Sequence, residues 1–150
     1  MKRIVYRYYL QRKATGFFNY LPILGADGVV DYAKKTFYKP EDVTEKLYAI
    51  FLDKKNFPIG YSVICSGGLH CCVMDRKLIA KTAIGLLASS VIILHTHPNG
   101  DATPSQSDIE ETKRLRSALL TLDIKMLDHV ILGEDGSYYS FADEHLVKEG

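Results

Sequence analysis

Two histidines and an aspartate stand close together in the segment LHTHPNGDATPSQSD, residues 94–108. His95 and His97 are two residues apart at the end of an apolar run, and side chains two apart on a strand point to the same face of a sheet. Two imidazoles and one carboxylate leave the fourth tetrahedral position of a zinc ion open, which favours a catalytic site over a closed structural one. We therefore predict that His95, His97 and Asp108 bind Zn²⁺.

These side chains can bind one ion only if the end of the strand that carries the histidines lies beside the start of the helix that carries Asp108. Residues 91–94 form a continuous apolar run, which is typical of a strand buried on both faces. A turn sequence at residues 98–100 follows. Thr103 is the expected N-cap of the next helix, with Pro104 at its first position and Gln106 completing a capping box. This predicts a helix over residues 104–120, with Ser105 and Asp108 on one face.

Apolar periodicity predicts the remaining elements. We expect a helix over residues 26–38, which ends before Pro40, and a second helix with Asp75 as N-cap that continues to Leu87. Gly67 and Gly68 either break a strand or precede a further strand over residues 70–74. The expected strands are 4–9, the hairpin 47–52 and 59–64, 126–132 and 137–141. This order indicates an α/β fold in which helices pack against one sheet.

Length and composition are those of an ordinary globular protein. The chain of 150 residues has a formal net charge of +1 and no linker-like stretch, so we expect a single domain over residues 1–150. No apolar run reaches the roughly 18 residues of a membrane span, and the N-terminus does not resemble a signal peptide, so we expect a cytoplasmic protein without membrane contact. Cys65, Cys71 and Cys72 lack a C-x-x-C spacing and are expected to be reduced thiols.

Basic residues and tyrosines alternate over residues 1–13, MKRIVYRYYLQRK. This is the only stretch that resembles a nucleic-acid contact, because such contacts combine cations with aromatic side chains. The simpler interpretation is a solvated edge strand whose Lys and Arg side chains discourage pairing with other chains. Nucleic-acid binding is thus possible but weakly supported.

The spacing of His95, His97, Ser105 and Asp108 matches the JAMM motif H-x-H-x₇-S-x₂-D of zinc metalloproteases. Residues 97–108, 127–133 and 139–146 closely resemble the C-terminal domain of bacterial RadC proteins. The resemblance covers roughly residues 40–147, with an N-terminal strand and helix in residues 1–39. It implies a JAB/MPN-like domain of the cytidine deaminase-like type, with a mixed β-sheet and helices packed against it.

The resemblance also implies roles for two further residues. Glu45, just ahead of an expected strand, corresponds to the general base, with Glu41 as its nearest competitor. Ser105 corresponds to the donor that binds the oxyanion, although a structural role in the first helical turn stays open.

Other polar residues near these segments have less specific expectations. His129 is expected to be a hydrogen-bonded core residue or to support a metal ligand, and Asp101 and Asp128 to form loop and strand-end hydrogen bonds. His70 and His145 are expected at the surface.

The function implied is that of a JAMM-type zinc metallopeptidase or isopeptidase, which cleaves an amide bond in a peptide or an isopeptide-linked protein. In such an enzyme zinc activates a water molecule and the glutamate takes its proton. An alternative is a RadC-like accessory protein of DNA repair or mobile elements that uses the zinc site for binding without proteolysis. Hydrolysis of a non-peptide bond at the same site is a third interpretation.

Overall fold

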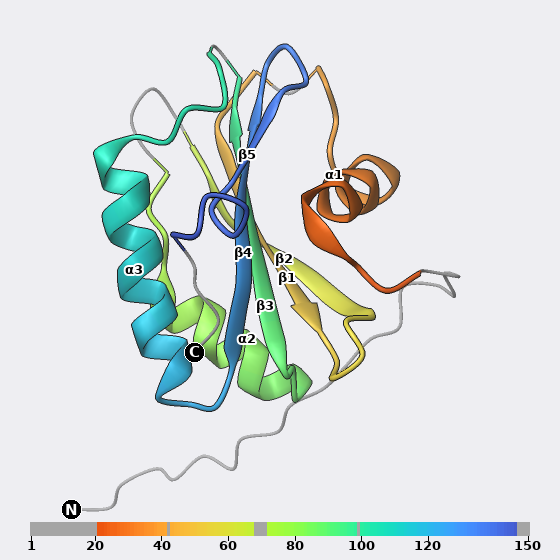
Figure 1. The fold of residues 1–150 in the computed structure, drawn as a ribbon, viewed down its shortest axis with the longest axis vertical. Helices are drawn as coiled ribbons and strands as arrows, with labels where there is room; N and C mark the ends of the chain where they lie inside the picture. The colour runs from red at the N-terminus through yellow and green to blue at the C-terminus, as the bar shows by residue number, and fades with distance from the viewer. Residues whose placement is uncertain (1–20, 42, 68–71, 99, 147–150) are drawn as a thin grey trace, which may run out of the picture.

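Within the described residues, which are 21–41, 43–67, 72–98 and 100–146 of the computed structural model, five strands form one mixed sheet in the order β2-β1-β3-β4-β5 (Figure 1). The strands are β1 (Lys46–Leu52), β2 (Pro58–Ser66), β3 (Ser90–His97), β4 (Lys125–Gly133) and β5 (Tyr138–Ser140). β1 pairs antiparallel with both β2 and β3, whereas β3 and β4 are parallel. A parallel pair needs a crossover connection, and a helix supplies it here.

Three helices of the described residues cover both faces of this sheet. α1 (Gly25–Thr36) lies on one face, and α2 (Arg76–Leu86) and α3 (Gln106–Leu120) lie on the other (Figure 1). The alternation of side chains along a strand explains this arrangement, because successive residues supply opposite faces. In β1, for example, Tyr48 and Ile50 pack towards α1, whereas Leu47 and Ala49 pack towards α2 and α3.

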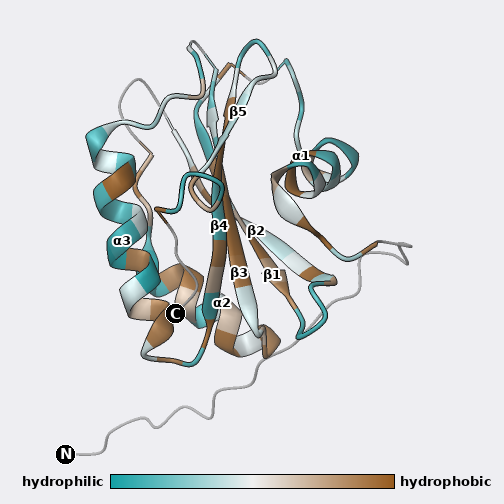
Figure 2. Cartoon of the chain, in the orientation of Figure 1, coloured by the Kyte–Doolittle hydropathy of each residue, from teal (hydrophilic) through white to brown (hydrophobic). Residues whose placement is uncertain are grey.

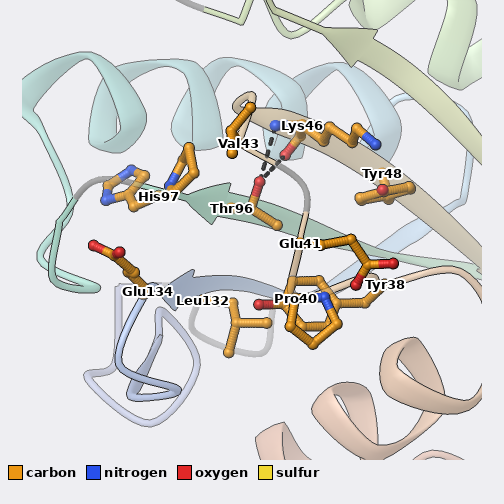
Figure 3. Close-up of a pocket in the computed structure, with 12 residues that line it drawn as sticks. Tyr38, Pro40, Glu41, Val43, Lys46, Tyr48, Thr96, His97, Leu132 and Glu134 are labelled. Carbon is orange, nitrogen blue, oxygen red and sulfur yellow. Dashed lines mark hydrogen bonds between the residues drawn. The ribbon is translucent and has the colours of Figure 1, made fainter.

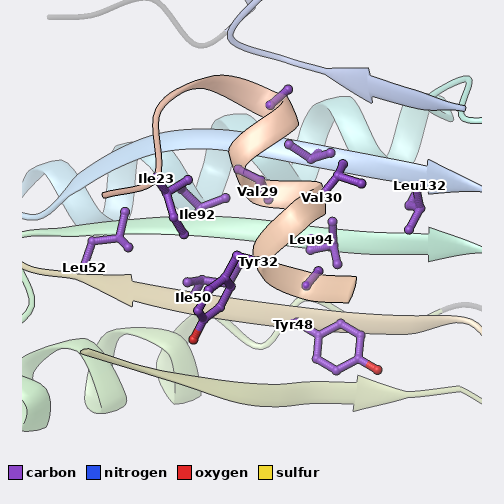
Figure 4. Packing of buried hydrophobic residues seen from close by; sticks show 13 residues of the cluster. Ile23, Val29, Val30, Tyr32, Tyr48, Ile50, Leu52, Ile92, Leu94 and Leu132 are labelled. Carbon is purple, nitrogen blue, oxygen red and sulfur yellow. The ribbon is translucent and has the colours of Figure 1, made fainter. Parts of the chain in front are cut away.

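The central strands are apolar on both faces, as the brown colour of β1 and β3 shows in Figure 2. On the α1 side the core contains Val29 and Val30 of the helix against Ile92 and Leu94 of β3 (Figure 4). Six of the seven residues of β1 and seven of the eight of β3 are buried. Burial of a side chain of this size stabilises the fold by about 1.5–3 kcal/mol, so the two strands form a stable base for residues at their ends.

The mixed α/β architecture predicted from the sequence is confirmed. The hairpin β1–β2, the buried strand β3 and the Asp75 cap of α2 all lie where the sequence indicated, and the Asp75 carboxylate accepts the backbone N–H of Leu78. The predicted strand over residues 4–9 lies outside the described residues.

The predicted start of the helix after the histidines is wrong. The helix after the histidines begins at Gln106 with Ser105 as N-cap, and Thr103 instead donates its backbone N–H to the Asp101 carboxylate. Ser105 displaces Thr103 because Asp108 lies three residues after it and completes a reciprocal capping box. Of the two alternatives at Gly67 and Gly68, the break of the second strand is confirmed, because β2 ends at Ser66 and residues 72–75 form no strand.

The expectation of reduced thiols is wrong for two of the cysteines. Cys65, near the end of β2, forms a disulfide with Cys72, which precedes α2, and their Cα atoms are 5.6 Å apart. The sequence did not reveal this pair because the fold, not the spacing, brings the end of β2 beside the segment that leads into α2. Cys71 lies outside the described residues.

Across the part of the chain that the structure describes, no helix combines the length and apolar character that a membrane crossing requires.

Candidate metal centre

The three predicted ligands converge where β3 ends and α3 begins. His95 and His97 project from one face of β3, with ring centroids 4.8 Å apart and ring planes nearly perpendicular. Asp108 reaches them from the first turn of α3. One candidate ligand atom from each residue lies within 4.8 Å of the others. The structure therefore brings together the His-His-Asp group that the sequence indicated.

The imidazole of His97 is held by the loop that follows β3. Its Nδ1 lies 2.9 Å from the backbone carbonyl of Asp101, and because a carbonyl only accepts, Nδ1 carries the proton. Nε2 is then left with its lone pair, 3.8 Å from Asp108 Oδ2. A histidine whose other nitrogen donates to a carbonyl is oriented for metal binding. The predicted loop role of Asp101 is thus confirmed, and the residue also supports a candidate ligand.

The carboxylate of Asp108 is fixed by the helix cap. Its Oδ2 accepts the backbone N–H of Ser105 at 2.8 Å and the Ser105 hydroxyl at 2.6 Å. The Ser105 oxygen in turn accepts the backbone N–H of Asp108 at 3.1 Å. Since the single hydroxyl proton of Ser105 is directed to Asp108, the geometry supports the structural role that the sequence left open. The role of Ser105 as an oxyanion donor stays a prediction.

His95 lies between two carboxylates. Its Nε2 is 2.5 Å from Glu45 Oε1, and its Nδ1 is 3.3 Å from Asp108 Oδ1. Nδ1 is buried and has no hydrogen bond among the described residues. A buried imidazole nitrogen without a hydrogen bond is costly unless another group, such as a cation, binds it.

The strand register explains why Glu45 reaches this position. Leu47 pairs with His95 across β1 and β3, so Glu45, two residues before Leu47, projects from the same face as the histidines. The backbone carbonyl of Glu45 accepts the N–H of Gly67, and its carboxylate lies 3.4 Å from the backbone nitrogen of Cys72. Glu41, the competing candidate for the base, is exposed and lies beside a pocket on the α1 side.

A second layer of polar groups lies beneath the candidate ligands. The Thr112 hydroxyl donates to the backbone carbonyl of Asp108, so it accepts from Nδ1 of His129 at 2.6 Å. His129 is fully buried, stacks on Phe141 at 4.7 Å and lies 6.0 Å from the His95 ring. The predicted core role of His129 is confirmed, but Thr112 was missed, because nothing in the sequence pairs a helical threonine with a strand histidine 17 residues later.

Asp128 also has the hydrogen-bonding role that the sequence indicated. Its carboxylate accepts the backbone N–H groups of His129 and Ala142 and the hydroxyl of Ser140. These bonds tie β4 to the turn after β5. His145 is exposed as expected, and His70 lies outside the described residues.

The surroundings shift the ionisation of these groups. Burial raises the pKa of Asp108, but the close contact and charge of His95 and the hydrogen bonds of Ser105 outweigh it and hold that pKa well below its usual range. Burial lowers the pKa of His95, but the two carboxylates reverse the effect and leave it raised. Burial and the charge of His95 lower the pKa of His129 to about 3, so its ring is neutral near pH 7.

A cavity of about 170 Å³ opens beside His97, on the α1 side of the sheet. Thr96 lies at its centre and Leu132 beside it (Figure 3). The Thr96 hydroxyl accepts the backbone N–H of Lys46 at 2.9 Å, which ties the pocket to the start of β1 directly after Glu45. The rim carries the carboxylates of Glu41 and Glu134.

The donor set fits a divalent metal ion such as zinc. Two imidazoles and one carboxylate converge, His97 presents an unprotonated nitrogen, and His95 has a buried nitrogen that lacks a hydrogen bond. Zinc accepts this combination of nitrogen and oxygen ligands and leaves a position for a fourth, non-protein ligand.

Comparison with known proteins agrees with this geometry. Residues 23–146 match the family model described as the RadC-like JAB domain. The match begins upstream of residue 40, where we expected the resemblance to begin, and includes α1.

Individual relatives give the same result. A UPF0758 protein of Chlorobaculum tepidum is 36% identical over 127 residues, which are 85% of this chain and 56% of the relative. A UPF0758 protein of Syntrophomonas wolfei is 44% identical over 90 residues, which are 60% of this chain and 38% of the relative. A UPF0758 protein of Carboxydothermus hydrogenoformans is 38% identical over 129 residues, which are 85% of this chain and 55% of the relative. The chain spans about half the length of the curated relatives it matches.

Proposed function

This chain belongs to the RadC-like JAB domain family, and on that premise we propose that it is a zinc-dependent hydrolase which cleaves an amide bond in a peptide or an isopeptide-linked protein. The observation that carries the proposal is the contact between Glu45 and His95. It puts a carboxylate from a separate strand against a three-residue donor cluster. A site built only to bind a structural metal has no need of this second acidic group.

His95, His97 and Asp108 would hold the zinc ion. When bound, zinc acts as a Lewis acid that polarises a carbonyl and lowers the pKa of a water molecule.

The chain's own residues would do the remaining work. The Glu45 carboxylate is the general base that takes a proton from water and passes it to the leaving amine. The Ser105 hydroxyl, now directed to Asp108, would turn towards the substrate to donate to the oxyanion.

The test is a comparison of two glutamate variants in the zinc-loaded protein. Glu45→Gln keeps the size of the side chain and removes its basicity, so zinc should stay bound while turnover falls by about 10²–10⁴-fold. Glu41→Gln is the matched control, because it changes the same group four residues earlier and should leave turnover within about threefold of the parent, the ordinary scatter of surface substitutions. Turnover is measured on a fluorogenic peptide library and on peptides joined through a lysine Nε amide.

Three results would contradict the assignment. Undiminished hydrolysis by zinc-loaded Glu45→Gln would exclude Glu45 as the base, and a heavy loss in Glu41→Gln would move that role to Glu41. Zinc loss on Glu45→Gln would make Glu45 a ligand. If the zinc-loaded parent cuts neither substrate class, the accessory role in DNA repair or mobile elements becomes the better interpretation. That alternative draws on residues 1–13, which lie outside the described residues.

A further inference from the structure

β2 is an edge strand with unusual composition. Within the described part of the chain it pairs only with β1, and its nine residues, PIGYSVICS, include no charged side chain. Natural edge strands are commonly protected from pairing by lysine, by other inward charges or by a short length. β2 has none of these three features, and its proline stands at the first residue only; its pairing with β1 is irregular at Ile59 and at Ile64. The outward backbone N–H and C=O groups of such an edge can pair with another strand.

The exposed side chains of β2 form an apolar row. Ile59, Tyr61 and Val63 alternate along the strand and are 39%, 44% and 48% exposed. The Tyr61 ring contacts that of Phe37, just after α1, at 4.7 Å, so the row lies on the α1 face of the sheet. It continues the apolar layer that α1 covers over the central strands.

The described chain begins beside the start of this strand. Ile23 donates its backbone N–H to Asn56, which stands two residues before β2. Figure 1 shows the start of α1 passing close to the turn between β1 and β2. Leu21 and Leu24 next to this contact are 83% and 70% exposed. Twenty residues of the chain precede Leu21, and the described chain begins at this end of β2.

The sequence of those residues matches the edge. Residues 4–10, IVYRYYL, are rich in β-branched and aromatic side chains, a composition typical of a strand, and Ile4, Tyr6, Tyr8 and Leu10 would share one of its faces. If the chain before Ile23 follows the outer edge of β2, it runs antiparallel to β2, because Ile23 lies beside the start of that strand. Residues 11–20 can span up to about 33 Å, which is more than the connection needs.

We propose that residues 4–10 pair with the outer edge of β2 as an additional antiparallel strand of the same chain, with Ile4, Tyr6 and Tyr8 covering the row Ile59, Tyr61 and Val63. This inference is independent of the proposed hydrolase activity. It assigns the basic, tyrosine-rich segment a place in the sheet, with Arg7 on its opposite face.

Hydrogen–deuterium exchange of the full-length chain tests the pairing. About half of the backbone N–H groups of an edge strand point outward, and an added strand would protect them. The double variant Tyr6→Pro/Tyr8→Pro removes two backbone N–H groups from residues 4–10, so this segment can no longer pair with β2. Peptides from residues 58–66 should then lose the protection of about four slowly exchanging amides. Ala14→Pro, in the proposed connection, is the matched control and should keep it.

Peptides from α3 report whether the proline variant remains folded, since they lie on the other face of the sheet. If the α3 peptides also lose protection, the variant Tyr6→Ser/Tyr8→Ser is used in place of the proline variant, because it removes the aromatic side chains and keeps the backbone N–H groups. The serine variant should still speed exchange in residues 58–66 alone. Unchanged exchange of β2 in the folded variants would overturn the proposal. Protection that rises with protein concentration, together with a dimer by sedimentation, would overturn it in favour of pairing between two copies.

Discussion

The Asp108 carboxylate caps α3 and is also a candidate metal ligand, and one substitution separates these two roles. Its Oδ2 accepts both polar hydrogens of Ser105, while the carboxylate faces the two histidines. Asp108→Asn keeps one oxygen for the cap but loses the negative charge that favours a cation. We expect this variant to keep its helix content and to lose most of the roughly one zinc per chain expected for the parent. Elemental analysis together with circular dichroism measures both.

The control for the metal prediction is Asp101→Asn, whose side chain holds the loop but whose backbone carbonyl, not its carboxylate, orients His97. It should bind zinc like the parent. Full zinc occupancy in both Asp108→Asn and His95→Ala would refute the proposed ligand set.

Ser105 has a measurable structural value whatever its part in catalysis. Ser105→Ala removes the hydroxyl that caps α3, and loss of such a cap lowers the free energy of unfolding by about 1 kcal/mol. Thr103→Ala, at the cap position that the sequence wrongly favoured, should change it by less than about 0.5 kcal/mol, since Thr103 is exposed and the variant keeps the backbone N–H that binds the Asp101 carboxylate. Urea unfolding of the metal-free protein compares the two. A larger cost at Thr103 would show that the helix begins earlier than described.

At the scale of elements, the loop that carries Asp101 depends on a close approach to β4. A Cβ atom at Gly133 would lie 3.0 Å from the backbone nitrogen of Ala102 and 2.9 Å from the Ser137 hydroxyl. The next residue, Glu134, donates its backbone N–H to Gly100 of the same loop. Gly133→Ala should therefore push the loop outward, cost about 1–3 kcal/mol of stability and weaken zinc binding through His97.

Gly100→Ala is the matched control for this prediction, because no atom lies within 4 Å of the added Cβ. Thermal unfolding with and without zinc measures both effects. Equal stability and equal zinc-induced stabilisation in the two variants would show that the close approach at Gly133 has no influence on the site.

The elements themselves were largely predictable from apolar periodicity, because β1, β3 and α2 each present a regular apolar pattern. The start of α3 was not, since two capping sequences overlap there and only the position of the Asp108 carboxylate distinguishes them. The Thr112–His129 pair and the Cys65–Cys72 disulfide depend on contacts between separate elements, which periodicity does not encode. The convergence of His95, His97 and Asp108 was predictable because these residues lie within a stretch of 14 residues.

For the molecule as a whole, the buried imidazole of His129 predicts how stability depends on pH. Its pKa falls from 6.5 to about 3 on folding, so the unfolded chain binds one more proton between these values. This contribution to stability is complete above pH 6.5 and is lost as the pH falls towards 3, at up to about 1.4 kcal/mol per pH unit. The raised pKa of His95 does not oppose this, because His95 is protonated in both states below 6.5.

His129→Gln keeps an N–H donor for Thr112 and removes the titration. The metal-free variant should therefore show a shallower loss of unfolding free energy than the parent between pH 6.5 and 5, above the range in which most carboxylates titrate. Urea unfolding at several pH values supplies both curves. Parallel curves would show that His129 accepts a proton in the folded protein as readily as in the unfolded one.

The antiparallel ladder between β1 and β3 has a consequence for how this site could change during evolution. The candidate ligands belong to one short, continuous stretch of chain, whereas Glu45 faces them only through the pairing of Leu47 with His95. A slip of that pairing by a single residue would turn Glu45 to the opposite face and leave the ligands where they are. One residue inserted between Glu45 and β1 is thus enough to take the proposed general base away from the candidate metal site, without any substitution among the candidate ligands.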